Sequence, residues 1–118
     1  MILVVGGLGQ GKLDYVLDKT GRSPEEVAYT PEEAETRPVF YGLERWPELD
    51  VDRLLQVNPG VVLICREVGC GVVPVEPEER AWREAAGRLC CRLAQRAECV
   101  VRIFCGLPMV LKGDGIWS

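Results

Sequence analysis

The sequence predicts an α/β fold in which helices flank a small, mostly parallel β-sheet, and three observations lead to this prediction. Short apolar runs typical of buried strands occur at residues 2–5, 61–65 and 100–104. Segments with helical patterns lie between these runs, at residues 11–20 and 76–97. Strand and helix therefore alternate along the chain with short connections, and right-handed crossovers would make the strands parallel.

The middle of the chain carries weaker signals than either end. Ser23 and Thr30 are each followed by a proline and two glutamates, which is the pattern of a helix start. Residues 38–46 indicate a short edge strand, and residues 47–60 indicate a short helix that ends at Asn58. We therefore count three clear strands, and a sheet this small would leave apolar edges that favour a homo-oligomer.

The helix expected at residues 76–97 is the longest in the chain and is amphipathic. Pro77 lies near its start, and one apolar face recurs at spacings of three and four residues, formed by Trp82, Ala86, Leu89, Cys90, Leu93 and Ala97. A row with a spacing of four residues carries charges, at Arg80, Glu84, Arg88, Arg92 and Arg96. Such a row is typical of a solvated helix face, although it could also meet phosphates or an acidic partner.

The composition excludes several functional classes. A net charge of −4 and a pI near 4.9 give the chain no attraction for nucleic acid or anionic lipid. We expect no membrane segment, because no apolar stretch approaches the roughly 20 residues needed to span a bilayer. The short apolar start lacks the features of a signal peptide, which predicts a cytoplasmic protein.

The cysteines and the lack of histidine restrict the chemistry. No two cysteines form a Cys-x-x-Cys pair, so we expect mostly buried thiols rather than a metal site at Cys65, Cys70, Cys90, Cys91, Cys99 and Cys105. This sequence contains no histidine, which is the commonest general base and metal ligand. Any catalysis must therefore use carboxylates, lysine, arginine, thiols or hydroxyls.

A glycine-rich segment follows the first strand and matches the spacing of a phosphate-binding loop. Two glycines stand five residues apart with a lysine directly after the second, in the run Gly6-Gly7-Leu8-Gly9-Gln10-Gly11-Lys12. In such a loop, backbone N–H groups and the helix start bind phosphate oxygens, and the lysine reaches the terminal phosphates. We therefore predict one P-loop NTPase-like domain over residues 1–118, with nucleotide bound by this run and by Leu13. The alternative is a glycine turn between strand and helix.

Leu13 stands where an ordinary phosphate loop has the serine or threonine that holds magnesium. Magnesium can also be held by one carboxylate together with phosphates, and Asp14 or Glu67 could supply that carboxylate. Asp14 could equally be a favourable charge in the first turn of a helix. Glu67 follows the strand at residues 61–65, at the end where α/β sheets bind ligands, although a surface pair with Arg66 is the alternative.

A longer motif occupies the second half of the chain. It begins with Glu67-Val68-Gly69-Cys70-Gly71-Val72-Val73-Pro74, continues with Arg80, Gly87-Arg88 and Leu93-Ala94, and ends with Gly106-Leu107-Pro108-Met109-Val110-Leu111-Lys112. Together with the glycine-rich segment, this motif resembles the bifunctional adenosylcobinamide kinase/adenosylcobinamide-phosphate guanylyltransferase family of cobalamin biosynthesis. The resemblance implies a nucleotide-binding α/β protein that forms oligomers. It also implies that ATP or GTP phosphorylates the aminopropanol hydroxyl of a cobinamide, and that GTP then donates GMP.

The sequence departs from the family pattern in three ways. The family carries the guanylyl group on a histidine between the glycine-rich loop and the later motifs, and this sequence has no histidine. The middle segment is shorter than the family's and lacks its aspartate-bearing strand. Leu13 replaces the serine of the family's loop. We therefore expect no histidyl–GMP intermediate.

The resulting prediction is a cytoplasmic cobalamin-biosynthesis transferase reduced to nucleotide binding or to the kinase step. Lys12 would stabilise the transferred phosphate, and Glu67 would act as a base or metal carboxylate. The implied cofactors are ATP or GTP with Mg2+, and the implied partners are nucleotide and a cobinamide, without nucleic acid or membrane. The alternative is a non-catalytic nucleotide- or corrinoid-binding subunit that regulates or scaffolds a partner enzyme.

Overall fold

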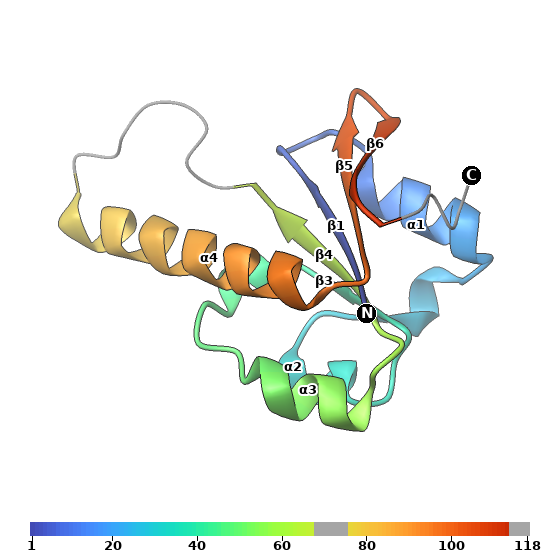
Figure 1. The fold of residues 1–118 in the computed structure, drawn as a ribbon, viewed down its shortest axis with the longest axis horizontal. Helices are drawn as coiled ribbons and strands as arrows, with labels where there is room; N and C mark the ends of the chain where they lie inside the picture. The colour runs from blue at the N-terminus through green and yellow to red at the C-terminus, as the bar shows by residue number, and fades with distance from the viewer. Residues whose placement is uncertain (68–75, 114–118) are drawn as a thin grey trace.

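The computed structural model describes residues 1–67 and 76–113 of the chain, and these ranges contain six strands in one mixed sheet (Figure 1). The strands are β1 (Ile2–Gly6), β2 (Val27–Ala28), β3 (Val39–Tyr41), β4 (Val62–Arg66), β5 (Cys99–Phe104) and β6 (Leu107–Lys112). Their order across the sheet is β2-β3-β4-β1-β5-β6, and every neighbouring pair is parallel except β5 and β6. The predicted α/β fold with a mostly parallel sheet is confirmed.

Four α-helices and two short 3-10 helices connect the described strands. They are α1 (Lys12–Thr20), η1 (Pro24–Glu26), α2 (Pro31–Ala34), η2 (Leu43–Arg45), α3 (Val51–Val57) and α4 (Pro77–Arg96). The proline-containing helix starts behave as predicted, because Ser23 forms a capping box with Glu26 and the Thr30 hydroxyl accepts from the Glu33 N–H. Gly21 ends α1 in the left-handed conformation that favours glycine.

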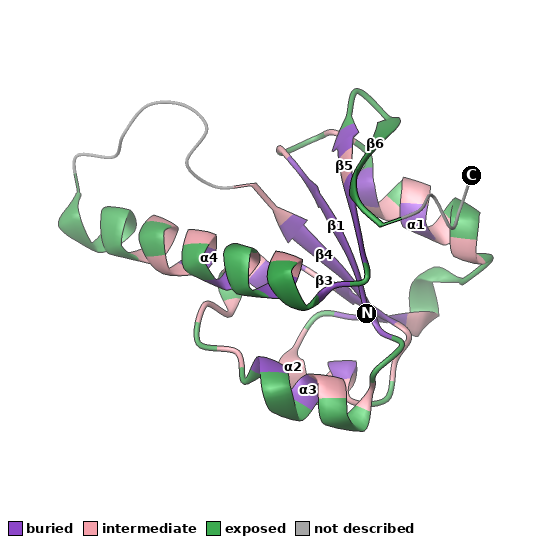
Figure 2. Ribbon diagram, in the orientation of Figure 1, coloured by how far each residue is buried: buried purple, intermediate pink, exposed green. Residues whose placement is uncertain are grey.

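Burial divides the core into two layers, one on each face of the sheet (Figures 1 and 2). Along β1, Leu3 and Val5 face the layer that contains residues of α3 and α4, whereas Ile2 and Val4 face the layer that contains Val16 of α1. The central strands are therefore apolar on both faces, as expected of parallel strands covered by helices. This arrangement explains why they appear in the sequence as uninterrupted apolar runs.

A strand forms within residues 38–46 as predicted, but the prediction that it lies at the edge of the sheet is wrong. This strand, β3, pairs with β4 on one side and with β2 on the other, so the two-residue strand β2 forms that edge. A strand as short as Val27–Ala28 is too brief to show a period-two pattern, and only its pairing with β3 identifies it. The count of three clear strands was therefore too low.

The second missed edge is β6, which forms a hairpin with β5 through the turn residues Cys105 and Gly106. Both residues have positive φ angles, 52° and 75°, as a tight two-residue hairpin turn requires. All six residues of β6 are exposed, so the strand lacks the alternation that reveals a half-buried strand. Its last residue, Lys112, donates to the carbonyls of Ala94 and Gln95 and thus caps the end of α4.

The long helix α4 uses the predicted apolar face. Ala86, Leu89 and Leu93 are buried on the sheet, while Trp82 and Cys90 are partly buried. The charged row on α4 forms exposed pairs, such as Arg88 with Glu84 and Arg96 with Asp52 of α3, which supports a solvated face.

The cysteines are free thiols in two kinds of environment. Cys65 and Cys99 are buried and Cys90 is partly buried, whereas Cys91 and Cys105 are exposed, contrary to the expectation of mostly buried thiols. A hydrogen bond with Cys90 and burial raise the pKa of the Cys65 thiol, which makes it a poor nucleophile. Within the described ranges no cluster of potential metal ligands occurs, and no helix is long and apolar enough to cross a membrane. Cys70 lies outside the described residues.

Candidate functional site

The glycine loop, residues 6–12, connects the end of β1 to the start of α1 at the carboxyl edge of the sheet. Gly6 is required by space, because a Cβ atom there would lie 2.7 Å from the Ile103 carbonyl oxygen of β5. Gly11 precedes α1 with a φ of 84°, and no side chain caps the first turn of this described helix. The helix therefore begins with backbone N–H groups that no side chain satisfies, at the positive end of its dipole.

Lys12 is the one buried charged residue in the part of the chain that the structure describes, with 6% of its surface exposed. Its ammonium donates to the carbonyl of Gly7 at 2.7 Å, so the side chain folds over its own loop. Burial lowers the pKa of Lys12 below its usual value, and the negative charge of Glu44 opposes that shift. The loop thus holds a cation that is poorly solvated and that would gain from an anionic ligand.

Leu13 packs against the apolar layer on the α1 face of the sheet, next to the buried residues of β1 and β4. A hydroxyl at this position would have to be accommodated beside an apolar layer. Leu13 therefore has a structural role, because it packs α1 against the sheet, and its backbone could contribute to ligand binding as well.

Gln10 connects the glycine loop to the β5–β6 hairpin. Its backbone carbonyl accepts from the Gly106 N–H at 3.0 Å, and its side-chain carbonyl accepts from the Cys105 N–H at 2.6 Å. These contacts join the loop to the turn of the exposed hairpin. The sequence predicts Gln10 only as a member of the phosphate-binding run, and its side-chain role depends on a contact 95 residues away.

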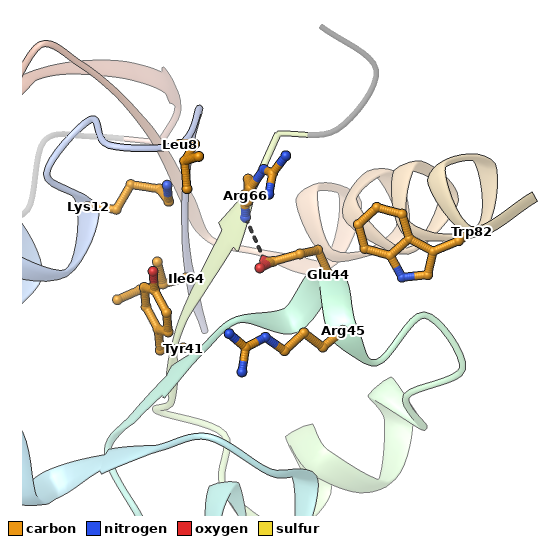
Figure 3. Close-up of a pocket in the computed structure, with 8 residues that line it drawn as sticks. All are labelled: Leu8, Lys12, Tyr41, Glu44, Arg45, Ile64, Arg66 and Trp82. Carbon is orange, nitrogen blue, oxygen red and sulfur yellow. Dashed lines mark hydrogen bonds between the residues drawn. The ribbon is translucent and has the colours of Figure 1, made fainter. Parts of the chain in front are cut away.

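A pocket of about 220 Å³ lies beside the glycine loop, on the side of the neighbouring strands β3 and β4 (Figure 3). Its wall combines cations, one carboxylate, two aromatic rings and two aliphatic side chains, from Leu8, Lys12, Tyr41, Glu44, Arg45, Ile64, Arg66 and Trp82. A basic, partly apolar pocket at the carboxyl ends of parallel strands is a natural place for an anionic or phosphorylated ligand.

Glu44 enters this pocket because the chain turns sharply after β3. Gly42 adopts a φ of 86° and donates its N–H to the Ile64 carbonyl, which continues the β3–β4 contact beyond the last paired residues. The Glu44 Oε1 atom then accepts from the Arg66 N–H at 2.9 Å. Glu44 is thereby fixed at the end of β4, in the same pocket as Lys12.

Glu67, the predicted catalytic carboxylate, lies close to the start of the glycine loop but makes a different contact. Its N–H donates to the Gly6 carbonyl at 2.8 Å. Its two carboxylate oxygens accept from Nε and Nη2 of Arg102 on β5, at 2.8 and 3.2 Å. The ion pair that Glu67 makes is therefore bidentate and reaches across β1, and its partner is Arg102 rather than the neighbouring Arg66.

The remaining predicted site residues are not brought together in this pocket. Asp14 is exposed in the first turn of α1 and does not line the pocket. Gly69 and Gly71 of the motif that follows Glu67 lie outside the described residues. Sequence reasoning missed four residues of the site, because they come from a short strand, a 3-10 helix and a distant α-helix that carry no motif for this site: Tyr41, Glu44, Arg45 and Trp82.

The fold and the pocket define a class of protein: an open, mostly parallel α/β domain with a ligand-sized pocket at the carboxyl ends of its strands. The family is given by sequence comparison. The family model for cobinamide kinase/cobinamide phosphate guanyltransferase matches residues 45–111, which is more than half of the chain. The protein belongs to this family of cobalamin biosynthesis, as the motifs from Glu67 to Lys112 predict.

A characterised relative supports the same assignment over a shorter region. The chain is 42% identical over 57 residues to the bifunctional adenosylcobalamin biosynthesis protein CobP of Pseudomonas aeruginosa. This alignment covers 48% of the chain and 33% of the relative, so the matched part is about a third of that protein's length. The family match begins at residue 45, and the glycine loop therefore precedes it.

Proposed function

We propose that this protein binds ATP or GTP at the glycine loop and transfers a phosphoryl group to an acceptor of cobalamin biosynthesis. The observation that supports this proposal most directly is the buried Lys12. It is the first residue of α1, whose start has no side-chain cap, and it lines a basic pocket. Binding the phosphates of a nucleotide would satisfy the free N–H groups of the loop and the poorly solvated ammonium together. Family membership supports the pathway.

In this proposal, the residues of the chain act mainly by positioning and by electrostatic stabilisation. The loop backbone orients the phosphates, and Lys12 stabilises the negative charge that develops on the transferred group. Arg45 and Arg66 line the same pocket and add positive charge on the acceptor side. Glu67 stays our candidate for the base or metal carboxylate only if its bond with Arg102 opens on ligand binding.

Magnesium would supply charge neutralisation and hold the phosphates in place, as it does in phosphoryl transfer generally. The donor chemistry of the pocket fits such an ion, because Glu44 offers a hard oxygen ligand beside Lys12.

The pocket also limits how an acceptor would bind. A volume of about 220 Å³ has no room for a corrin ring, so only the hydroxyl-bearing aminopropanol arm of a cobinamide would enter it. The larger part of the acceptor would lie outside this pocket. Guanylyl transfer through histidine has no candidate residue in this sequence.

A non-catalytic nucleotide- or corrinoid-binding subunit is the second candidate function, and the Glu67–Arg102 pair favours it. Both carboxylate oxygens of Glu67 already accept hydrogen bonds from Arg102, so a substrate proton or a metal ion would have to displace the guanidinium. Under this alternative, nucleotide would bind and turnover would be absent.

We also propose that the protein is a homo-oligomer that associates through β6. This edge strand exposes large apolar side chains, with exposed fractions of 69% for Leu107, 52% for Met109 and 56% for Leu111. Met109→Lys should shift the sedimentation coefficient toward that of a monomer. An unchanged oligomer, or a monomeric parent protein, would contradict this proposal.

Calorimetric titration with ATP and GTP, with and without Mg2+, tests the main proposal. We expect binding that Lys12→Ala weakens by at least about tenfold, and phosphorylation of a cobinamide by the unchanged protein. Binding without turnover would favour the non-catalytic subunit. A Lys12→Ala protein with the parent's nucleotide affinity would refute the assignment of the glycine loop.

A further inference from the structure

The loss of the loop hydroxyl at Leu13 raises the question of which protein oxygen meets the cation of a bound nucleotide. The inference drawn from it rests on the proposed function, namely that the glycine loop binds a nucleotide. Magnesium usually keeps several waters and takes one or two protein carboxylates together with the phosphates. One well-placed carboxylate is therefore enough, and the structure offers three candidates, Asp14, Glu67 and Glu44.

Two of these candidates are poorly placed. Asp14 is exposed on α1 and does not line the pocket beside Lys12. Both oxygens of Glu67 accept from the Arg102 guanidinium, so a cation would have to displace a bidentate charged pair.

Glu44 differs from both in where its carboxylate lies. It lines the same pocket as Lys12, and Figure 3 shows the carboxylate turned toward the side of the pocket where Lys12 and Leu8 lie, away from Trp82. Lys12 marks where the terminal phosphates of a nucleotide would be. Among the described residues that line this pocket, Glu44 therefore offers the carboxylate to a cation bound to those phosphates.

The side chain of Glu44 is also held in a defined orientation. Its Oε1 atom accepts from the Arg66 N–H at 2.9 Å, and the Gly42 N–H anchors the preceding turn to Ile64 at 3.0 Å. Among the residues that the structure describes, no hydrogen bond is made to the second oxygen, Oε2. A backbone donor that fixes one oxygen and leaves the other for a ligand is a recurring feature of metal carboxylates.

We propose that Glu44 is the carboxylate that binds the divalent cation of the nucleotide, in place of the missing loop hydroxyl. Oε2 of Glu44 would supply the protein oxygen that the loop hydroxyl supplies in an ordinary phosphate-binding loop. Among the described residues that line the pocket, Glu44 is the one acidic side chain, and this assignment gives it a function on the side of β3 and β4 rather than on α1.

The test measures how much Mg2+ strengthens ATP binding, by calorimetry with Mg2+ or with a chelator, in the full chain. Glu44→Gln is nearly isosteric and keeps an oxygen that can accept from the Arg66 N–H, so the fold should survive. Glu48→Gln is the matched control, because it removes the same charge from an exposed position four residues further on. Binding of Mn2+ with ATP, followed by electron paramagnetic resonance, reports the cation directly.

We expect Glu44→Gln to reduce the gain in affinity from Mg2+ by at least about tenfold, because even outer-shell partners of metals are worth that much. Its affinity for ATP without metal should stay equal to the parent's or rise, since a negative charge near the phosphates is gone. Glu44→Asp should recover part of the gain, and Glu48→Gln should retain all of it.

Two results would overturn the inference, and they are distinguishable. If the parent binds ATP and the gain from Mg2+ persists in Glu44→Gln, Glu44 is not the ligand, and loss of the gain in Asp14→Asn or Glu67→Gln would identify the residue that is. If the parent binds no nucleotide with or without metal, the proposed function itself fails, and the role of Glu44 fails with it.

Discussion

Replacement of Lys12 by methionine should separate the stability of this protein from its function. Methionine preserves the unbranched stem and removes the charge. Lys12 is buried and its ammonium donates to the Gly7 carbonyl, and a hydrogen bond that involves a charged group contributes about 1.5–3 kcal/mol. Burial lowers the pKa of Lys12, so the desolvation of the charge offsets what the bond contributes. We therefore expect the free energy of unfolding at pH 7 to stay within about 1 kcal/mol of the parent's or to rise.

The pH dependence of this difference follows from the direction of the pKa shift. Between the lowered pKa of folded Lys12 and the usual 10.5, the unfolded chain binds the proton and the folded protein does not. The parent therefore gains stability relative to Lys12→Met as the pH rises through that window. Urea unfolding of both proteins at neutral and alkaline pH measures this change. Lys19→Met, which removes an exposed charge from the same helix, is the control for the loss of a lysine that is not buried.

Lys12→Met should weaken nucleotide binding, although it leaves the free energy of unfolding at pH 7 nearly unchanged or raises it. Hydrogen bonds to charged groups contribute about 1.5–3 kcal/mol, so the loss of the ammonium should weaken ATP binding about 10- to 100-fold. A Lys12→Met protein that is destabilised by more than about 2 kcal/mol at pH 7 would refute the reasoning, because the ammonium would then be a net stabilising group. The reasoning would also be refuted if the stability of the parent relative to Lys12→Met did not increase as the pH rises.

Two further substitutions test the packing of the fold. Gly6→Ala should destabilise the protein by about 1–3 kcal/mol, because its Cβ would lie 2.7 Å from the Ile103 carbonyl oxygen, whereas Gly60→Ala meets open space and should be nearly neutral in urea unfolding. Equal effects of the two would contradict the close approach of β1 and β5. Leu93→Ala should lower the free energy of unfolding by about 2–5 kcal/mol, since Leu93 of α4 is fully buried. Leu8→Ala, at a side chain that is 73% exposed, should change the free energy of unfolding by less than about 0.5 kcal/mol. A small effect at Leu93 would show that α4 is not part of the core.

The position of Leu13 links the sequence to the site. The sequence alone identifies the missing hydroxyl but gives no reason for it. In the structure Leu13 packs on the α1 face of the sheet, so the same side chain that removes a metal ligand adds apolar contact. The carboxylate that we propose in its place comes from a different element, η2, which lies beside β4.

The sequence by itself determined the centre of the fold and the glycine loop. Strands β1, β4 and β5 are buried on both faces, which requires uninterrupted apolar runs, and those runs are visible without any tertiary information. Local chemistry likewise determined where the helices start and stop, through Ser23 and Thr30 at the caps and Gly21 at the end of α1. The family motifs from Glu67 to Lys112 were also readable directly, and the family match confirms them.

Only the tertiary structure decided which residues share the site. Glu44, Arg66 and Trp82 come together through the pairing of β3 with β4 and the crossover of α4, and no spacing in the sequence encodes that proximity. The same holds for Glu67, whose partner Arg102 is 35 residues away on the far side of β1. The edge strands β2 and β6 were hidden for different physical reasons. Both residues of β2 are buried, but a strand of two residues is too short to show a period, whereas β6 is exposed along its whole length and is defined by its pairing with β5, which leaves no alternating pattern in the sequence.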